Sequence, residues 1–186
     1  MDTEKKLNEI ECALYKESRI CNYRQDIVVC NLSWAMLNHE ADFVAVTKNG
    51  YMTEVEIKRS WSDFLADFKK DVKQHKDEHV YRFFYCVPLS IYPKVKEYLH
   101  DNPIELKAVI TYDENLHFEF HHDYEGAPCE IEMINGREMC HSSRYIMWDR
   151  RKLFLEEMLH IARVGCMRIW SRKLKDVPNE NELKFN

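Results

Sequence analysis

The 186-residue sequence has few of the residues that mark flexible or cross-linked chains. Only four glycines and five prolines are present, which argues against long linkers and low-complexity tracts. The seven cysteines form no Cys-x-x-Cys pair, so neither a disulfide framework nor a standard zinc motif has support. A glycine-rich phosphate loop is also missing, and nucleotide binding therefore has no local signal.

Long hydrophobic runs are absent as well. No stretch approaches the roughly 18 apolar residues that cross a bilayer, and the polar start of the chain lacks the apolar segment of a secretion signal. We therefore expect a cytoplasmic protein with reduced cysteines and no membrane partner. Its 45% hydrophobic and 32% charged residues are ordinary for a globular protein. We expect one domain over residues 1–175 and a polar tail over 176–186.

Positive charge is scarce overall but unevenly distributed. The formal net charge is −5, which argues against a nucleic-acid partner. Residues 144–176 nevertheless carry nine Lys and Arg against four Asp and Glu, and residues 58–76 carry six against three. Two positive segments on an acidic body suit contact with phosphates. Two solvated helix faces would give the same pattern.

Hydrophobic patterning predicts helices that alternate with strands. Helical spacing covers residues 3–18, 60–75, 92–100 and 145–174, whereas β-rich runs cover 26–33, 40–47, 51–58, 79–87, 105–112 and 116–122. Lys48-Asn49-Gly50 between two of these runs predicts a hairpin. Residues 123–143 have no regular pattern and are predicted to be a loop. The order predicts an α/β fold with a mixed central sheet.

The predicted hairpin brings charged residues together. Side chains alternate along a strand, so Glu54, Glu56 and Lys58 share one face. Asp42, on the other strand of the hairpin, lies in the hydrophobic run 41–46, where a carboxylate is costly unless it is paired or binds a metal. Asp42 beside Glu56 would suit a hard divalent cation, which prefers oxygen ligands.

This arrangement suits phosphodiester chemistry. Magnesium can hold a phosphate oxygen and orient a water, while Lys58 can stabilise developing charge or position the water. Glu11 lies on the inward stripe of the first helix and can serve as a further ligand or a base. The ordinary alternative is that Glu56 and Lys58 form a surface ion pair on an edge strand, with Asp42 a polar residue near a turn.

The segment EADFVAVTKNGYMTEVEIKRSWSDFLADFKKD resembles the core of the PD-(D/E)xK nuclease superfamily. It is closest to the MmcB-like DNA repair proteins and small phage-encoded relatives. The shared signature is an Asp on one strand, Glu-Ile-Lys on the next, and a Ser and an Asp-Phe pair that open a helix. Here these are Asp42, Glu56-Ile57-Lys58, Ser60 and Asp63-Phe64. Glu11, Lys69 and the strand RFFYCVP match further family features, so the resemblance spans roughly residues 7–112.

The resemblance implies a restriction-endonuclease-like αβββαβ core with a mixed central sheet flanked by helices, plus a long C-terminal helix. It also implies a deoxyribonuclease that depends on Mg²⁺ or Mn²⁺ and acts in DNA repair, recombination or mobile-element biology. The implied catalytic residues are Asp42, Glu56, Lys58 and Glu11. Asp42, Glu56 and Ile57 would bind the metal, while Ser60, Asp63 and Lys69 would support the site or contact DNA.

Two departures and two alternatives accompany this interpretation. Ala41 stands where many family members have proline, and the chain after Tyr112 matches only loosely. The rival functions are a catalytically silent nucleic-acid-binding protein that retains the nuclease fold and a protein-interaction module without metal. A homodimer is compatible with cutting both strands at once, although nothing in the sequence indicates one.

Overall fold

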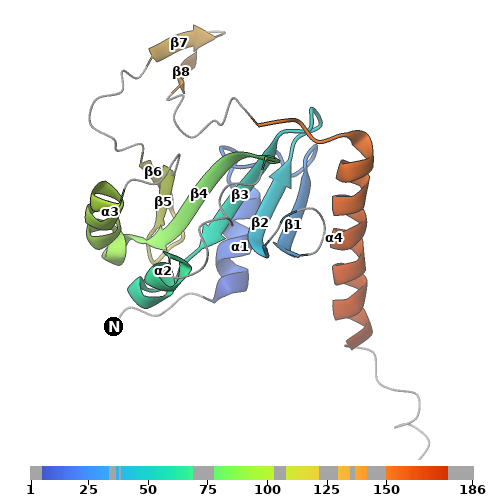
Figure 1. Ribbon diagram of the computed structural model, residues 1–186, viewed down its shortest axis with the longest axis horizontal. Helices are drawn as coiled ribbons and strands as arrows, with labels where there is room; N and C mark the ends of the chain where they lie inside the picture. Colours follow the sequence, from blue (N-terminus) through green and yellow to red (C-terminus); the bar gives the residue numbers. More distant parts are fainter. Residues whose placement is uncertain are drawn as a thin grey trace, which may run out of the picture.

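The centre of the molecule is a six-stranded mixed sheet (Figure 1). The computed structural model describes residues 6–33, 37, 39–68, 78–102, 108–121, 130–134, 137–141 and 150–175; for 130–134, 137–141 and 175 it describes the backbone alone. The strands of this sheet are β1 (Ile27–Leu32), β2 (Ala41–Val46), β3 (Met52–Ile57), β4 (Val80–Pro88), β5 (Ala108–Tyr112) and β6 (Phe118–His121).

Strand order in the sheet follows the order in the chain, β1-β2-β3-β4-β5-β6. The β3–β4 and β4–β5 pairs are parallel, and the other three pairs are antiparallel. The two parallel connections contain helices, because parallel neighbours need a crossover that a tight turn cannot make. Helix α2 (Trp61–Phe68) lies between β3 and β4, and helix α3 (Tyr92–Asp101) follows β4 after the short 3₁₀ helix Leu89–Ile91.

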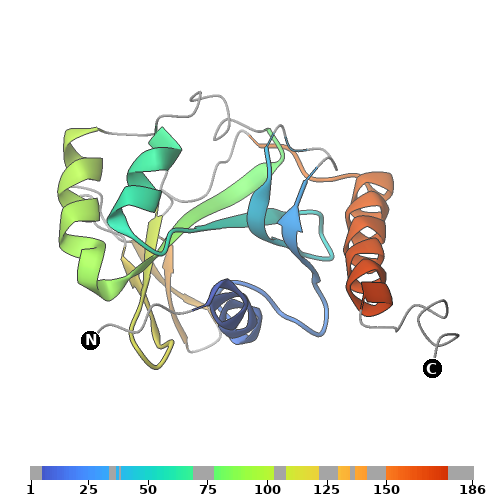
Figure 2. The ribbon, with the colours of Figure 1, turned by 90° about the horizontal axis from the view of Figure 1, so that it is seen from below.

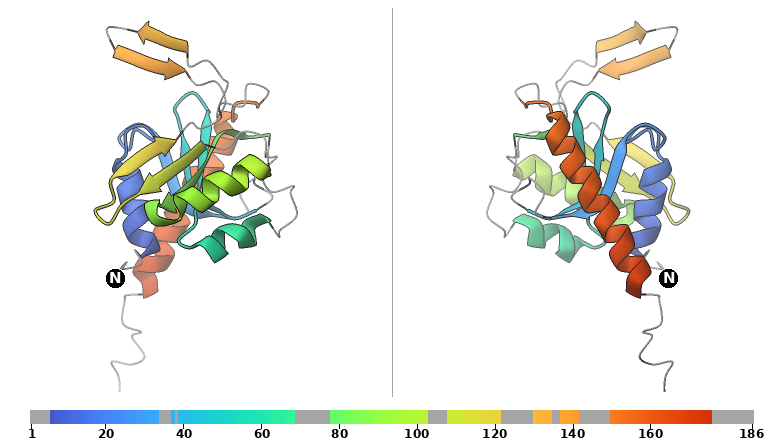
Figure 3. Two further views of the ribbon diagram at one scale, coloured as in Figure 1. Left: turned by 90° about the vertical axis from the view of Figure 1, so that its left-hand side faces the viewer. Right: turned by 90° about the vertical axis from the view of Figure 1, so that its right-hand side faces the viewer.

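Four described helices flank the sheet. Helix α1 (Leu7–Lys16) covers one face, while α2 and α3 lie over the opposite face (Figure 2). Helix α4 (Leu155–Lys175) runs beside the edge strand β1 (Figures 1 and 3). The α/β class, the mixed sheet and the long C-terminal helix predicted from the sequence are confirmed. No helix among the described residues is both long and apolar enough to cross a membrane.

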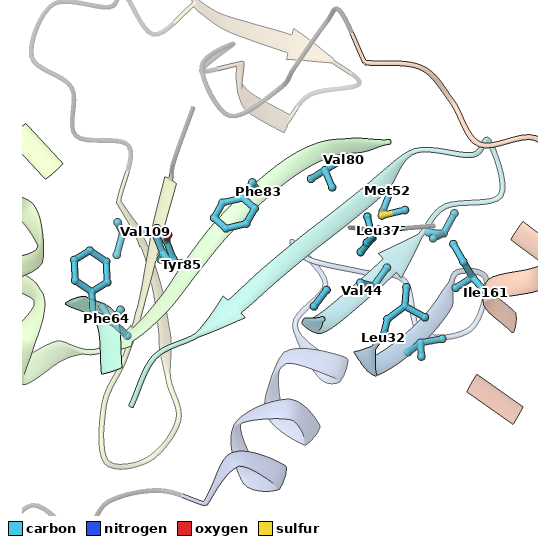
Figure 4. Packing of buried hydrophobic residues seen from close by; sticks show 14 of the residues in the cluster. Leu32, Leu37, Val44, Met52, Phe64, Val80, Phe83, Tyr85, Val109 and Ile161 are labelled. Atoms are coloured by element: carbon cyan, nitrogen blue, oxygen red, sulfur yellow. The ribbon is translucent and has the colours of Figure 1, made fainter. Parts of the chain in front are cut away.

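Alternating side chains divide the core into two hydrophobic clusters. The cluster on the α1 side includes Ile10, Phe43 and Val55. The cluster on the α2 and α3 side contains Phe64 and Tyr85, whose ring centroids are 5.2 Å apart, and continues across the sheet to Ile161 of α4 (Figure 4). Both faces of β3 are therefore buried, including the face that carries its carboxylates.

The hairpin predicted at Lys48-Asn49-Gly50 is confirmed. The Gly50 amide donates to the Thr47 carbonyl at 2.9 Å, and the backbone of Gly50 has φ +83°, a left-handed conformation that favours glycine. The Gly50 carbonyl in turn accepts a hydrogen bond from the amide of Leu153 at 2.9 Å. This turn thus fixes both the β2–β3 pairing and the segment that leads into α4.

Replacing Gly50 by Ala is expected to lower the free energy of unfolding by about 2 kcal/mol or more. An added Cβ would strain the left-handed backbone and would lie 2.6 Å from the Leu153 carbonyl oxygen, which cannot rotate away. Urea denaturation measures the change. The control is Lys48→Ala in the same turn, which is exposed and should change stability by less than about 0.5 kcal/mol. Equal stability of the two variants would contradict this account of the turn.

Two predicted elements are wrong in the structure. The region 123–143, expected to be a loop, contains the antiparallel hairpin of β7 (Glu130–Ile134) and β8 (Arg137–His141), which forms a separate two-stranded sheet. The alternation of Glu130, Ile131, Glu132 and Met133 is a strand signal, but it is too short to stand out within an irregular region. The final helix begins at Leu155 rather than 145, because residues 151–154 are not helical and Leu153 hydrogen-bonds to Gly50 in the β2–β3 turn. The predicted tail at 176–186 lies outside the described residues.

Candidate active site

Strand pairing brings Asp42 and Glu56 to the same face of the sheet. Phe43 of β2 pairs with Val55 of β3, and both side chains face α1. Their neighbours Asp42 and Glu56 therefore face the opposite side, next to each other across the two strands. The two carboxylates thus lie side by side, as predicted, at the open end of the hairpin, away from its turn.

The Asp42 carboxylate is held by the backbone of the next strand. Its Oδ2 accepts a hydrogen bond from the Ile57 amide at 2.8 Å. The pKa of Asp42 is raised to about 6, mainly by burial and next by the negative charge of Glu56, and the hydrogen bond from the Ile57 amide opposes this rise only in part. Two neighbouring carboxylates in a poorly solvated position repel each other, and a cation between them would relieve that repulsion.

Glu56 offers a buried oxygen for such a cation. The residue is only 5% exposed, and its Oε2 accepts a hydrogen bond from Lys58 Nζ at 2.8 Å. Its Oε1 is buried and has no hydrogen-bond partner among the described residues. Burial raises the pKa of Glu56 against the opposing effect of Lys58. An unsatisfied buried carboxylate oxygen costs about 1–3 kcal/mol, so a ligand at this atom would be stabilising.

Lys58 lies between two carboxylates. Its Nζ donates to Glu56 at 2.8 Å and to Asp67 of α2 at 3.2 Å. Asp67 is held in turn by the hydroxyl of Tyr85, which donates to its Oδ2 at 2.7 Å. Burial opposes the charge of Lys58, but the surrounding carboxylates outweigh it and raise the pKa of Lys58 above its ordinary value. The ammonium group therefore stays protonated at neutral pH.

A second group of potential ligands adjoins Glu56. One ligand atom each of His39, Glu54 and Glu56 lies within 4.8 Å of the others, a spacing that suits a metal ion. His39 Nε2 and Glu54 Oε1 are 2.6 Å apart, and Glu54 is fully buried. Glu56 thus belongs to this group and also neighbours Asp42. Carboxylate and imidazole together suit several divalent metals, so this donor set alone does not select magnesium.

Glu11 lies at the edge of the site. Its carboxylate is mostly buried, and its Oε1 accepts a hydrogen bond from the Asn31 side chain at 2.8 Å. Burial raises the pKa of Glu11, with a smaller contribution from the charge of Asp42, whereas Arg172 of α4 lowers it. Glu11 is therefore within electrostatic range of Asp42 but is hydrogen-bonded to β1.

Ser60 and Asp63 form the start of α2. Ser60 Oγ accepts a hydrogen bond from the Asp63 amide at 3.2 Å, and Asp63 Oδ2 accepts one from the Arg59 amide at 3.0 Å. The Ser60 hydroxyl thus caps the start of the helix, and Asp63 holds the residue before the cap. The negative charge of Asp63 also raises the pKa of Asp42, so the helix start lies near the proposed metal ligands. Lys69, the third predicted supporting residue, lies outside the described residues.

Sequence reasoning missed His39, Asp67 and Tyr85. Asp67 follows Phe64 by three residues and shares its inward helix face, which is the same signal that singled out Glu11. His39 lies just before β2 and carries no local pattern. The role of Tyr85 depends on the β3–β4 pairing, which places Tyr85 beside Glu56. Tyr85 and Glu56 lie on strands that are connected through α2, so no short sequence motif predicts that they are neighbours.

Comparisons with known proteins place the fold but not the chemistry. No family model matches the chain, and no curated protein matches it. One solved structure, the SPO1766 protein of unknown function from Silicibacter pomeroyi, is similar over 96% of each chain with a TM-score of 0.53 and 14% sequence identity. At this identity the likeness concerns the fold alone, which is therefore shared with a protein of distant sequence.

Proposed function

We propose that this chain is a metal-dependent nuclease that hydrolyses DNA phosphodiester bonds. The observation that carries the proposal is the end of the β2–β3 hairpin, where Asp42 and Glu56 face each other beside the buried ammonium group of Lys58. Surface ion pairs need no such burial. A buried face with three charged groups, one of which retains an unbonded oxygen, costs stability that only a function explains.

The order of elements supports the finer assignment of the fold. The chain runs α1-β1-β2-β3-α2-β4, which is the αβββαβ order of the restriction-endonuclease-like core. Asp42 lies in the second strand of that order, Glu56 in the third, and Lys58 just beyond it. These are the positions that the PD-(D/E)xK resemblance requires. The strand pairing is consistent with the positions that the resemblance implies.

The proposed metal ligands are Asp42, Glu56 and Ile57, the last through its carbonyl oxygen. A divalent cation bound there would supply Lewis-acid stabilisation of the phosphate and a more acidic water. The buried Oε1 of Glu56 and the mutual repulsion of the two carboxylates fit this group. The Ile57 amide fixes the orientation of Asp42 through its hydrogen bond, so the backbone of β3 positions both side chains.

Lys58 would act as a fixed positive charge. Its raised pKa keeps the ammonium group protonated, so it suits stabilisation of developing negative charge rather than removal of a proton from water. Asp67 and Tyr85 would hold Lys58 in place. Glu11 remains the candidate for a general base, because burial raises its pKa and a carboxylate with a raised pKa accepts protons more readily.

A cleavage assay tests the proposal. Wild-type protein is incubated with single-stranded, duplex and branched DNA in magnesium, in manganese and in chelator. We expect metal-dependent cleavage that is lost in Asp42→Asn and in Glu56→Gln. DNA binding without cleavage under every condition would favour the silent binding protein. Neither binding nor cleavage would favour the protein-interaction module.

Calorimetric titration with magnesium and manganese separates the two candidate ligand groups. If the cation lies between Asp42 and Glu56, then Asp42→Asn and Glu56→Gln should each weaken binding at least tenfold, and His39→Gln should leave it within about twofold. Strong dependence on His39 with no effect of Asp42 would instead assign the ion to the group of His39, Glu54 and Glu56. Absence of heat from either metal would contradict the metal centre altogether.

A further inference from the structure

The side of α4 that faces the sheet changes character along the helix. At about 100° per residue, four residues lie within about 60° of one another on this side: Ile161, Gly165, Arg168 and Arg172. Ile161 is fully buried in the hydrophobic cluster on the α2 and α3 side. At Gly165 an added Cβ would lie 2.8 Å from a methyl group of Val29, so the helix backbone closely approaches β1. The first half of this side therefore packs on the sheet.

The second half of this side carries two arginines at the end of β1. Arg168 donates to Ser33 Oγ at 2.6 Å, and Ser33 directly follows the last residue of β1. Arg172 lies about one turn further along the helix, and its charge lowers the pKa of Glu11. Figure 1 shows α4 continuing past the end of β1. Both arginines thus lie where the sheet ends rather than over its core.

This end of β1 adjoins the candidate active site. The residues before and after Asn31 on β1 pair with the two neighbours of Asp42 on β2, so Asn31 lies opposite Asp42. The Asn31 side chain donates to Glu11 at 2.8 Å. Glu11 is in turn within electrostatic range of both Asp42 and Arg172. The arginines of α4 therefore flank the proposed metal ligands on the β1 side of the site.

The two arginines form no ion pair with any carboxylate among the described residues. Their surroundings on the helix are also positive, because residues 158–175 contain five Lys and Arg and no Asp or Glu. The neighbouring site is rich in carboxylates, which repel a phosphate chain, and cations beside the site would offset that repulsion. A cation near the end of a helix is also favoured by the helix dipole, but the dipole does not select the side that faces the site.

We propose that Arg168 and Arg172 bind backbone phosphates of the DNA substrate on the β1 side of the site. The proposal rests on the proposed nuclease function and names the residues that hold the strand there. A guanidinium group binds a phosphate through paired N–H donors. The bond to Ser33 fixes the direction of Arg168 and leaves its other N–H groups as donors. The two arginines are about 6 Å apart along the helix axis, so they suit nearby phosphates of one strand.

The salt dependence of DNA binding tests the proposal. Binding of a fluorescein-labelled DNA duplex by the full chain is measured by anisotropy in chelator, so that no metal-dependent cleavage occurs. Each lost phosphate contact lowers the slope of log K against log salt by about 0.9, so Arg168→Gln with Arg172→Gln should lower it by about 1.8. Arg168→Lys with Arg172→Lys keeps both charges and should retain the wild-type slope. The control is Arg163→Gln, because Arg163 is exposed and lies about 180° around α4 from Arg172. It should leave the slope unchanged.

The outcomes separate this proposal from the nuclease function. A lowered slope in the Gln variant, without cleavage by the wild type in magnesium or manganese, would support the phosphate contacts and contradict the enzyme. Cleavage by the wild type with an unchanged slope in the Gln variant would support the enzyme and overturn the phosphate contacts. Absence of DNA binding by the wild type, or an equal fall in slope in Arg163→Gln, would also overturn them. Circular dichroism checks that each variant folds.

Discussion

Replacing Lys58 by Met is expected to lower the free energy of unfolding by about 3–5 kcal/mol. The ammonium group of Lys58 donates to both Glu56 and Asp67, and all three side chains are less than a tenth exposed. Methionine has a similar volume, so the packing loss is small and the main effect is electrostatic. Two carboxylates would remain buried without their shared counter-charge, and the cost of such uncompensated charge exceeds the ordinary value of an ion pair.

Urea denaturation in chelator at neutral pH measures this loss. Lys48→Met serves as the control, because Lys48 is exposed in the β2–β3 turn and should change stability by less than about 0.5 kcal/mol. Adding Asp67→Asn to Lys58→Met should recover part of the loss, since one of the two uncompensated charges is then removed. A loss below about 1 kcal/mol in Lys58→Met, or no recovery in the double variant, would mean that the ammonium group of Lys58 is not the counter-charge of Glu56 and Asp67.

The parts of the fold that the sequence predicted are those with strong local signals. The Asn-Gly turn required a left-handed residue, and Gly50 supplies it with φ +83°. Alternation along β3 placed Glu54, Glu56 and Lys58 on one side, and the structure has that arrangement on a strand buried on both faces. Short-range sequence patterns determine these features, so they could be predicted without knowing how the rest of the chain folds.

The parts that the sequence did not predict depend on long-range contacts. Asp67 reaches Lys58 only because α2 folds back over β3, and Tyr85 reaches Asp67 only because β4 lies parallel to β3. The later start of α4 has a similar cause. Residues 150–154 have helical composition, but the Arg151 amide hydrogen-bonds to Glu78 and the Leu153 amide to Gly50, which keeps this stretch out of the helix. Tertiary contacts there override local preference.

The proposed site explains why the core tolerates an arrangement that opposes folding. The pKa of Asp42 is raised by burial and by the charge of Glu56, so ionisation of Asp42 disfavours the folded state. Glu56 has a raised pKa for similar reasons, only partly offset by Lys58. A protein without a ligand at this position gains nothing from these carboxylates, whereas a cation would turn the same charges into a binding site.

The replacement of Asp42 by Asn is therefore expected to stabilise the metal-free protein at pH 8 by about 3 kcal/mol. Asparagine keeps the oxygen that accepts the Ile57 amide but carries no charge. Below pH 4, Asp42 is protonated in both the folded and the unfolded chain, and the advantage is absent. As the pH rises from about 4 to about 6, the unfolded chain loses the proton first, so wild-type stability falls. Above about pH 6 the loss is complete and the advantage of the variant is constant.

Denaturation of wild type and Asp42→Asn across this pH range, first in chelator and then in magnesium, tests the argument. The control is Asp113→Asn, because hydrogen bonds lower the pKa of the partly exposed Asp113, and removal of this charge should give no gain in stability at high pH. Magnesium at about 100 times its wild-type dissociation constant should stabilise the wild type by about 2.7 kcal/mol and a variant that binds tenfold more weakly by about 1.4 kcal/mol, so the advantage of the variant should shrink by at least about 1.3 kcal/mol. If Asp42→Asn is instead less stable in chelator at pH 8, the carboxylate already has a stabilising partner in the folded chain, and its burial needs no cation.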